Sequence, residues 1–270
     1  AQFSLPIVDT ERIAKRKKDR VTYRIPALIY ISDNRILLAF AEKWKTADDT
    51  DIWNHLALHH LLINGSSAWD SSHELLTSAC LPNHRSMNPC PVYERESKTL
   101  FLFFICDTGK TWIVPTYVYP CNSLNFKPTS RKGSTWHLGK CVDGESNECQ
   151  MAEIIDDKGN SKLYFEALSE SNGEAFDKPS SAHKLTEIGH ATEKTWLLYC
   201  HPTNPRKRAC LGVYLNKSPW DASGWEDHKL IIYDGPNGYS DLAQCGDGKQ
   251  FACLMECGEI SEVFKLSDII

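Results

Sequence analysis

One arginine stands where an apolar strand is expected. The stretch TYRIPALIY (22–30) is apolar after Pro26, and Arg24 enters it between Tyr23 and Ile25. A guanidinium in such surroundings needs a counter-charge, because taking a charge out of water without a partner is costly. We therefore expect Arg24 to face an anion.

Two other groups of residues have types that could bind a metal ion, but their spacing does not favour it. CLMEC (253–257) has too little support around its two cysteines, and His55 and His59 lie in NHLALHH, which alternates like a strand. A strand does not present residues i and i+4 to one ion as a helix does. The sequence therefore predicts no metal site and no cofactor.

The elements that must position such residues are predicted to be short strands. Helical periodicity is scarce, and runs rich in Val, Ile, Leu, Phe and Tyr recur instead, each bounded by turn formers. Examples are IPALIYI, ILLAFAE, HLALHHLLI, LFLFFI, WIVPTYVY, KTWLLYC, ACLGVYL, KLIIY and FACLM. Many short strands at near-even spacing predict an all-β fold, and a β-propeller is one such solution.

A weak repeat favours the propeller over a sandwich. CDTGKTW (106–112), SRKGSTW (130–136), SESNGEAF (169–176) and, more loosely, WDASGW (220–225) share polar residues, a glycine, and then a hydroxyl or aromatic residue. Each predicts a tight hairpin whose glycine takes positive φ while the aromatic ring packs back on the sheet. Several unrelated turns are the alternative.

Length and charge narrow the class of protein. The chain has 270 residues, which suits one large domain or two small ones, and we expect a single domain over 1–270. Its net charge of −5 implies no general attraction to nucleic acid or anionic lipid. The exception is the basic run RIAKRKKDR (12–20), so we expect 1–20 to be a flexible lead-in, with contact to an acidic membrane surface as the alternative.

The cysteines indicate a reducing compartment. There are eleven, scattered from Cys80 to Cys257 without regular spacing. No charged-then-apolar leader opens the sequence, and runs such as LFLFFIC (100–106) are too short to span a bilayer. We interpret the cysteines as reduced thiols and expect a cytoplasmic protein.

The order of the motifs resembles one enzyme family. YRIP before an apolar strand resembles the F/Y-R-I-P motif near the start of sialidases (exo-α-sialidases, neuraminidases). Further matching segments follow in the same order: LLAFAEKWKTADD (37–49), HRSMNPCPVYE (84–94), TLFLFFI (99–105), VPTYVY (114–119), NECQMAE (147–153), HPTNPRKRACLGVYLN (201–216) and GYSDL (238–242). They run nearly end to end and are similar to the animal cytosolic-type enzymes.

This resemblance implies a fold and an activity. The fold is a six-bladed sialidase propeller, in which the glycine hairpins resemble the Asp-box and Asp107 with Trp112 forms the best copy. The activity is the retaining hydrolysis of terminal sialic acid from glycoproteins, gangliosides or oligosaccharides.

The resemblance assigns two arginines to the carboxylate of the sugar. Arg24 and Arg208 match this role, and a planar guanidinium clasps a carboxylate with two charge-assisted hydrogen bonds as lysine does not. Glu256 matches a glutamate that partners the first arginine in relatives. The plainer interpretations are a strand-end charge for Arg24 and a surface salt bridge for Arg208.

Three further residues match catalytic positions. Tyr239 in NGYSDL matches the nucleophile. A tyrosine suits this role because a carboxylate nucleophile would be repelled by the carboxylate of the substrate. Glu148 in SNECQ matches the base that takes the phenol proton. Asp49 matches the acid that protonates the leaving group, with Asp48 and Asp51 as rivals. A core aromatic residue and an exposed turn carboxylate are the alternatives for Tyr239 and Glu148.

The walls of the pocket follow by the same resemblance. Met87 and Asn88 match contacts to the N-acetyl region, and Tyr117 and Tyr119 match the wall near the glycerol tail. The alternatives are an Asn-Pro turn and ordinary strand packing.

The sequence departs from the family in one respect. Sialidases place three arginines on the carboxylate, but no arginine occurs between Cys149 and Pro205, and the chain is shortened there and elsewhere. We expect one or two incomplete blades. For the lost clasp we expect weaker substrate and transition-state binding, and hence a drop in activity of about two or more orders of magnitude. The alternative functions are therefore a sialoglycan-binding propeller with weak or no turnover, and a propeller scaffold for protein partners.

Overall fold

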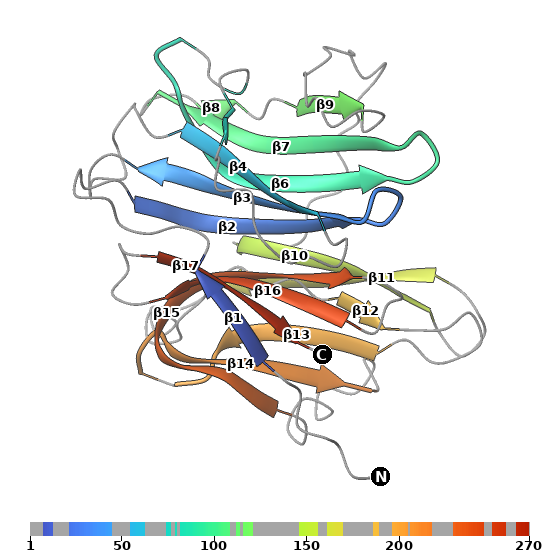
Figure 1. Cartoon of the computed structure of the whole chain (residues 1–270), viewed down its shortest axis with the longest axis vertical. Coiled ribbons are helices and arrows are strands. Elements are labelled where there is room, and N and C mark those ends of the chain that lie inside the picture. The colour runs from blue at the N-terminus through green and yellow to red at the C-terminus, as the bar shows by residue number, and fades with distance from the viewer. Residues whose placement is uncertain are drawn as a thin grey trace. The chain divides into compact units, whose positions relative to one another are not determined.

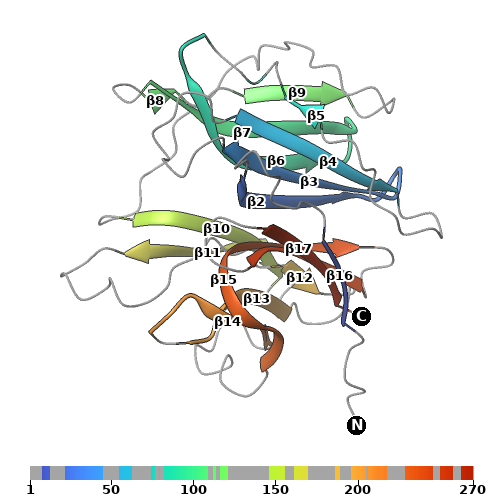
Figure 2. The same cartoon turned by 60° about the vertical axis from the view of Figure 1, so that its left-hand side comes forward.

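The structure of the chain is a computed structural model, shown in two views in Figures 1 and 2. It describes residues 8–12, 22–44, 55–62, 74–76, 79, 82–108, 112–113, 116–120, 146–155, 161–169, 186–188, 196–204, 206–217, 229–245, 250–257 and 263–269. The elements within these residues are strands, so the prediction of an all-β fold is confirmed.

Seventeen strands are present in the described residues. They are β1 (Val8–Arg12), β2 (Thr22–Ile31), β3 (Ile36–Trp44), β4 (His55–Leu62), β5 (Glu74–Leu75), β6 (Arg85–Glu94), β7 (Thr99–Asp107), β8 (Trp112–Ile113), β9 (Thr116–Pro120), β10 (Ser146–Ile155), β11 (Ser161–Ser169), β12 (Thr186–Ile188), β13 (Trp196–Pro202), β14 (Ala209–Asn216), β15 (Lys229–Cys245), β16 (Gln250–Cys257) and β17 (Val263–Ile269). The strand pairs with a defined register, among them β2–β3, β6–β7 and β14–β15, are antiparallel.

The chain divides into two compact units. The first unit comprises Ile13–Cys141 and Ser261–Val263, and the second comprises Ala1–Arg12, Val142–Ile260 and Phe264–Ile270. The first unit holds a sheet in the order β2-β3-β4-β5 and a sheet in the order β6-β7-β8, with β9 also paired to β7. The second unit holds the pair β10-β11 and a seven-stranded sheet in the order β1-β17-β16-β15-β14-β13-β12.

The core of the first unit lies between its two sheets. Alternate residues of three strands face it: Ala27, Ile29 and Ile31 from β2, Ile36, Leu38 and Phe40 from β3, and Leu100, Leu102, Phe104 and Cys106 from β7. This alternation is the period of a strand with one face on a core. Burying each leucine contributes roughly 1.5–3 kcal/mol, so the core fixes the strands that carry Arg24 and its neighbours.

The second unit is organised around the long strand β15. Its first half pairs with β14 up to Pro236, and its second half pairs with β16 from Asn237 onward. The core beside it gathers Leu198, Cys200, Leu211, Val213, Ile232, Leu242, Phe251, Cys253 and Met255. The strand thus changes partner immediately before Tyr239.

The strand residues that flank one predicted hairpin, CDTGKTW (106–112), are described. Asp107 of β7 is the direct partner of Trp112 of β8, and the glycine between them lies outside the described residues. The predicted hairpins at 130–136 and 220–225, and nearly all of the one at 169–176, lie outside the described residues. Within the segment expected as a lead-in, Val8–Arg12 forms β1 and pairs with β17.

Candidate active site

The predicted site residues coincide with irregularities in strand pairing. Register shifts separate Arg24 from Ala27 in β2, Met87 from Cys90 in β6, Asn147 from Gln150 in β10, Ala209 from Leu211 in β14, and Asn237 from Ser240 in β15. Arg24, Met87, Asn88, Glu148 and Tyr239 lie at or inside these shifts, and Arg208 directly precedes one. A β-bulge re-aims a side chain and is over-represented beside active sites.

The backbone inside three of these bulges is strained. Ile25, Asn88 and Cys210 have φ of 52°, 53° and 60°. Positive φ is a genuine outlier for a β-branched residue such as Ile25, and such strain persists only where the surroundings impose it. Pro26 and Pro89 come next in sequence and have no N–H to donate to a ladder, which suits a bulge. The motifs RIP and MNP therefore encode the same local bend.

In the first unit, Arg24 lies over the ring of a tryptophan. The guanidinium carbon is 4.6 Å from the ring centroid of Trp44, which is buried. The indole Nε1 of Trp44 donates to Oε2 of Glu42 at 2.7 Å, and the main-chain N–H of Asn88 donates to Oε1 of the same carboxylate at 2.7 Å. Glu42 is also the direct partner of Arg24 across the β2–β3 pair. A cation, a ring and a carboxylate thus meet at the two bulges.

The carboxylate of Glu42 is an unusual group because it is almost fully buried. Its exposed fraction is 1 %. Burial raises its pKa to about 7, against the opposing effects of the Asn88 and Trp44 hydrogen bonds and of the charges of Arg24 and Arg85. Burial therefore makes the neutral form of Glu42 far more accessible than that of an exposed glutamate.

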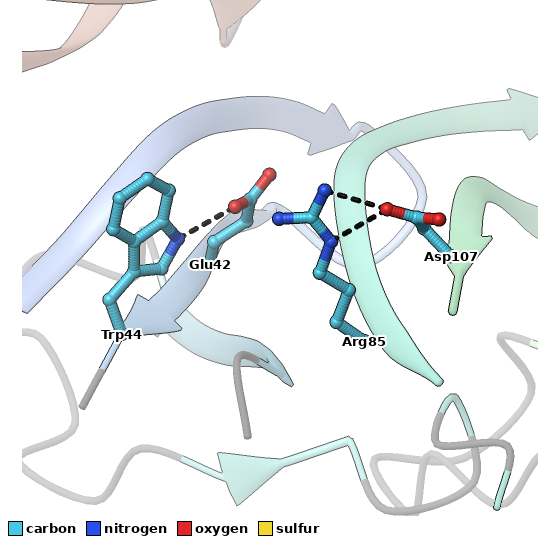
Figure 3. Close-up of polar contacts among 4 residues, drawn as sticks. All are labelled: Glu42, Trp44, Arg85 and Asp107. Carbon is cyan, nitrogen blue, oxygen red and sulfur yellow. Dashed lines mark hydrogen bonds and ion pairs between the residues drawn. The ribbon is translucent and has the colours of Figure 1, made fainter. Parts of the chain in front are cut away.

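A buried ion pair adjoins this group. Nε and Nη2 of Arg85 donate to Oδ2 of Asp107 at 2.9 and 2.6 Å, and Asp107 is 1 % exposed. Figure 3 shows the guanidinium of Arg85 between the carboxylates of Glu42 and Asp107. Arg85 begins β6 and Asp107 ends β7, so the pair fixes the strand that carries Met87 and Asn88.

In the second unit, Arg208 lies over the ring of Tyr239. The guanidinium carbon is 5.1 Å from the ring centroid. The main-chain N–H of Asn237 donates to the carbonyl of Arg208 at 2.9 Å, which ties the two strands together beside this contact. A cation within about 6 Å of an aromatic centroid is attracted to the face of the ring. The arginine and the phenol are therefore held as one group.

A second buried glutamate supports this group. The main-chain N–H of Tyr239 donates to Oε2 of Glu256 at 3.3 Å, and Glu256 is 4 % exposed. Gly238 permits this approach, because a Cβ there would overlap Oε2 and come within 3.1 Å of Cδ of Glu256. Glu256 therefore packs against the backbone that presents the tyrosine.

The structure brings some of the predicted residues together and leaves others undescribed. Arg24 and Asn88 gather around Glu42 in the first unit, and half-buried Met87 lies in the same bulge as Asn88. Arg208 and Tyr239 gather in the second. The remaining predicted residues are placed only by strand or not at all: Glu148 lies in β10, Tyr117 and Tyr119 lie in β9 opposite Leu102 and Leu100, and Asp49, Asp48 and Asp51 lie outside the described residues.

Sequence reasoning missed Glu42, Trp44 and Arg85. The signal for Glu42 was present in ILLAFAE, where one acid ends an apolar run, just as Arg24 interrupts another. In the first unit the carboxylate nearest to Arg24 along its strand pair is Glu42. The predicted pairing of Arg24 with Glu256 joins the two units and stays a prediction.

The described residues were also compared with the requirements of a metal site and of a membrane-spanning helix. Within those residues, no group of three or more His, Cys, Asp or Glu side chains could hold a metal ion. No helix in the same part of the chain has the length and apolarity needed to cross a membrane.

The chain is similar in sequence to animal proteins named as sialidases. The chain is 30 % identical to Sialidase-3 of Bos taurus over 393 aligned positions, which cover 96 % of this chain and 90 % of the relative. It is 31 % identical to Sialidase-2 of Mus musculus, with 90 % of this chain and 91 % of the relative covered. Because 96 % of 270 residues fills only about two thirds of 393 positions, the remaining positions are gaps in this chain. No protein-family model matches the sequence.

A solved structure shows the same fold. The sialidase of Trypanosoma rangeli, in complex with 2,3-difluorosialic acid as a covalent intermediate, matches with a TM-score of 0.63 and 12 % identity. The match covers 97 % of this chain and 58 % of that chain. The chain therefore has a sialidase-type propeller fold.

Proposed function

The chain belongs to the animal sialidase family, and on this premise we propose that it releases terminal sialic acid from glycans with retention at the anomeric carbon. The observation that carries the proposal is the contact of Arg208 with Tyr239. Sialic acid bears its carboxylate on the anomeric carbon itself. A guanidinium that clasps this carboxylate therefore brings the reacting carbon to the phenol beside it.

The first chemical step forms a bond between sugar and enzyme. The phenol oxygen of Tyr239 attacks the anomeric carbon while Glu148 accepts the phenol proton. The glycosidic bond breaks, and Asp49 gives its proton to the departing glycan oxygen. Sialidases with a tyrosine nucleophile are known exceptions to the two-carboxylate rule, and the sialidase of Trypanosoma rangeli forms a covalent intermediate with 2,3-difluorosialic acid.

The second step reverses the first with water in place of the glycan. Asp49, now ionised, takes a proton from water, and the resulting oxygen attacks the anomeric carbon. The bond to Tyr239 breaks, and Glu148 returns the proton to the phenol. Two displacements at one carbon give net retention.

The remaining residues bind the sugar. Arg24 supplies the second guanidinium for the carboxylate, Met87 and Asn88 face the N-acetyl group, and Tyr117 and Tyr119 line the glycerol tail. Two arginines rather than three predict weaker binding than in a three-arginine site, because each charged hydrogen bond contributes about 1.5–3 kcal/mol. The substrates are sialylated glycoproteins, gangliosides or oligosaccharides.

The arrangement of blades belongs to this proposal too. The sheets β2–β5 and β6–β9, and the two halves of the seven-stranded sheet on either side of the bulge in β15, each supply the strands of one blade. The pair β10-β11 supports an incomplete blade in a six-bladed plan, and its second strand lies in the stretch without arginine.

Hydrolysis of a fluorogenic sialoside tests the function. We expect turnover of the sialoside, none of the matched neutral galactoside, and the α-anomer of sialic acid as the first product in proton NMR. Equal turnover of the galactoside, or first formation of the β-anomer, would contradict the proposal. If the protein shows no turnover but its melting temperature rises in the presence of a dehydrated sialic acid analogue, the sialoglycan-binding function would be favoured.

A further inference from the structure

A single carboxylate joins the two strained bulges of the first unit. Glu42 belongs to β3, in the sheet with Arg24, whereas Asn88 belongs to β6 in the other sheet of the unit. One oxygen of Glu42 accepts the Trp44 indole N–H beneath Arg24, and the other accepts the main-chain N–H of Asn88. We propose that Glu42 is a positioning residue that sets Arg24 and the Asn88 bulge for the substrate, and that it takes up a proton when the substrate carboxylate binds. This inference rests on the proposed function.

The two hydrogen bonds of Glu42 connect it to the support of Arg24 and to the Asn88 bulge. Each of its hydrogen bonds is 2.7 Å long, and each uses a different oxygen of the carboxylate. Trp44 can serve as a flat support for the Arg24 guanidinium only while its ring is fixed, and its N–H bond to Glu42 fixes the ring in its plane. The Asn88 amide belongs to a residue with φ of 53°, so its bond to Glu42 helps to retain a strained turn.

The charges around Glu42 make it sensitive to a bound anion. Arg24 faces it from β2 and Arg85 from β6, while Asp107 of β7 already occupies Arg85. The residue opposite Glu42 on β4 is the apolar Leu56. Arg24 is therefore the cation that Glu42 and a substrate carboxylate would share.

Binding of an anion then changes the protonation of Glu42. A carboxylate on Arg24 weakens the attraction of that guanidinium for Glu42 and adds a like charge nearby, and both effects favour the neutral acid. Because burial already raises the pKa of Glu42 to about 7, a further rise on binding draws a proton from solvent near pH 7. A buried residue with a purely structural role would not take up a proton when the substrate carboxylate binds.

Titration calorimetry measures the proton directly. The dehydrated analogue 2-deoxy-2,3-didehydro-sialic acid is titrated at pH 7 into the folded wild-type chain in two buffers of different ionisation enthalpy. The difference in heat gives the number of protons taken up. We expect a net uptake of a fraction of one proton by the wild type at pH 7.

Three variants separate the roles. Glu42→Gln should abolish the uptake and raise Kd and KM about tenfold, with kcat changed less than about threefold, because Glu42 orients Arg24 and does not touch the reacting atoms. Trp44→Phe keeps a ring but loses the N–H, so we expect a smaller rise in KM. The lost hydrogen bond had lowered the pKa of Glu42, so more of the free variant is already protonated at pH 7 and we expect a smaller proton uptake than in the wild type. Glu94→Gln is the matched control. Glu94 ends β6, away from the Arg24 site, and its carboxylate also accepts two main-chain N–H groups, from Glu96 and Ser97. It should behave as the wild type.

The outcomes distinguish this inference from the proposed function. Binding by the wild type without proton uptake would overturn the inference and leave the function intact. The same proton uptake in Glu42→Gln as in the wild type would overturn it as well. If a folded wild type neither binds the analogue nor cleaves the sialoside, the proposed function fails and this inference fails with it.

Discussion

Two parts of the molecule hold an arginine in the same way. Arg24 lies over the ring of Trp44 at 4.6 Å, and Arg208 lies over the ring of Tyr239 at 5.1 Å. In each case a buried glutamate accepts an N–H group of the residue that carries the ring, and a β-bulge adjoins the arginine. We call these the Arg24 group (Arg24, Trp44, Glu42) and the Arg208 group (Arg208, Tyr239, Glu256).

The difference between the groups lies in what the glutamate holds. Glu42 accepts the ring N–H of Trp44, so the polar atom of that ring is used in fixing the ring itself. Glu256 accepts the main-chain N–H of Tyr239, so this bond fixes the backbone that carries the tyrosine rather than its ring. Under the proposed function, the Arg24 group binds the substrate and the Arg208 group both binds and reacts with it.

Replacing each ring with phenylalanine should reveal the largest difference in kcat between the Arg24 group and the Arg208 group. Both variants keep a ring beneath the arginine, but only Tyr239→Phe removes the reacting oxygen. We expect kcat on a fluorogenic sialoside to fall at least about a thousandfold in Tyr239→Phe and less than about tenfold in Trp44→Phe. Similar losses in the two variants would show that the phenol oxygen has no special role.

Lysine at either arginine should have the next largest effect. A lysine keeps the charge but loses the planar fork that clasps a carboxylate and lies flat on a ring. We expect kcat/KM to fall about 10- to 100-fold in Arg24→Lys and in Arg208→Lys, since about 1.5–3 kcal/mol is lost. The comparison predicts that the loss appears mainly in KM at Arg24 and also in kcat at Arg208. Steady-state kinetics would show an identical split at both positions if the two groups were equivalent.

A pH series of unfolding measurements isolates the Arg24 group. Burial raises the pKa of Glu42 from 4.5 to about 7, so between these values the folded chain holds a proton that the unfolded chain has released. The resulting stability is fully present below pH 4.5 and is lost as the pH rises through 7. We expect the free energy of unfolding to fall by about 2 kcal/mol more in the wild type than in Glu42→Gln between pH 5.5 and 7.5. Parallel pH dependence in the two proteins would count against a raised pKa.

Alanine at Gly238 should disturb the Arg208 group by the smallest amount. The new Cβ would overlap the buried carboxylate of Glu256, and we expect a loss of about 1–2 kcal/mol in the free energy of unfolding. Gly235→Ala is the matched control, because its Cβ would meet the half-buried ring of Tyr233, which can turn aside. Chemical denaturation of both variants measures the difference, and equal losses would mean that Glu256 gives way as easily as Tyr233.

The sequence could predict what depends on local pattern. Strands followed from alternating apolar residues, and the pairing of Asp107 with Trp112 agrees with the hairpin that CDTGKTW predicts. Arg24 was recognisable because its charge interrupts the apolar run of β2, whereas Arg208 followed only from the family resemblance. The RIP and MNP motifs also carried a local signal, since a proline after a residue with positive φ marks a bulge.

What the sequence could not predict depends on contacts between distant strands. The hydrogen bond from the main-chain N–H of Asn88 to the carboxylate of Glu42 joins residues 46 positions apart in two different sheets. The raised pKa of Glu42 depends on burial by both sheets, which no local pattern reports. The same holds for Arg208 and Tyr239, whose contact requires β15 to change partner at its bulge.

Trapping of the reaction intermediate tests the central claim most directly. The wild-type chain is incubated with 2,3-difluorosialic acid, whose second fluorine slows release of the sugar, and the adduct is located by peptide mass mapping. We predict one sialyl adduct per chain, attached to the phenol oxygen of Tyr239 and absent from Tyr239→Phe. An adduct on another residue, or undiminished labelling of Tyr239→Phe, would contradict the account.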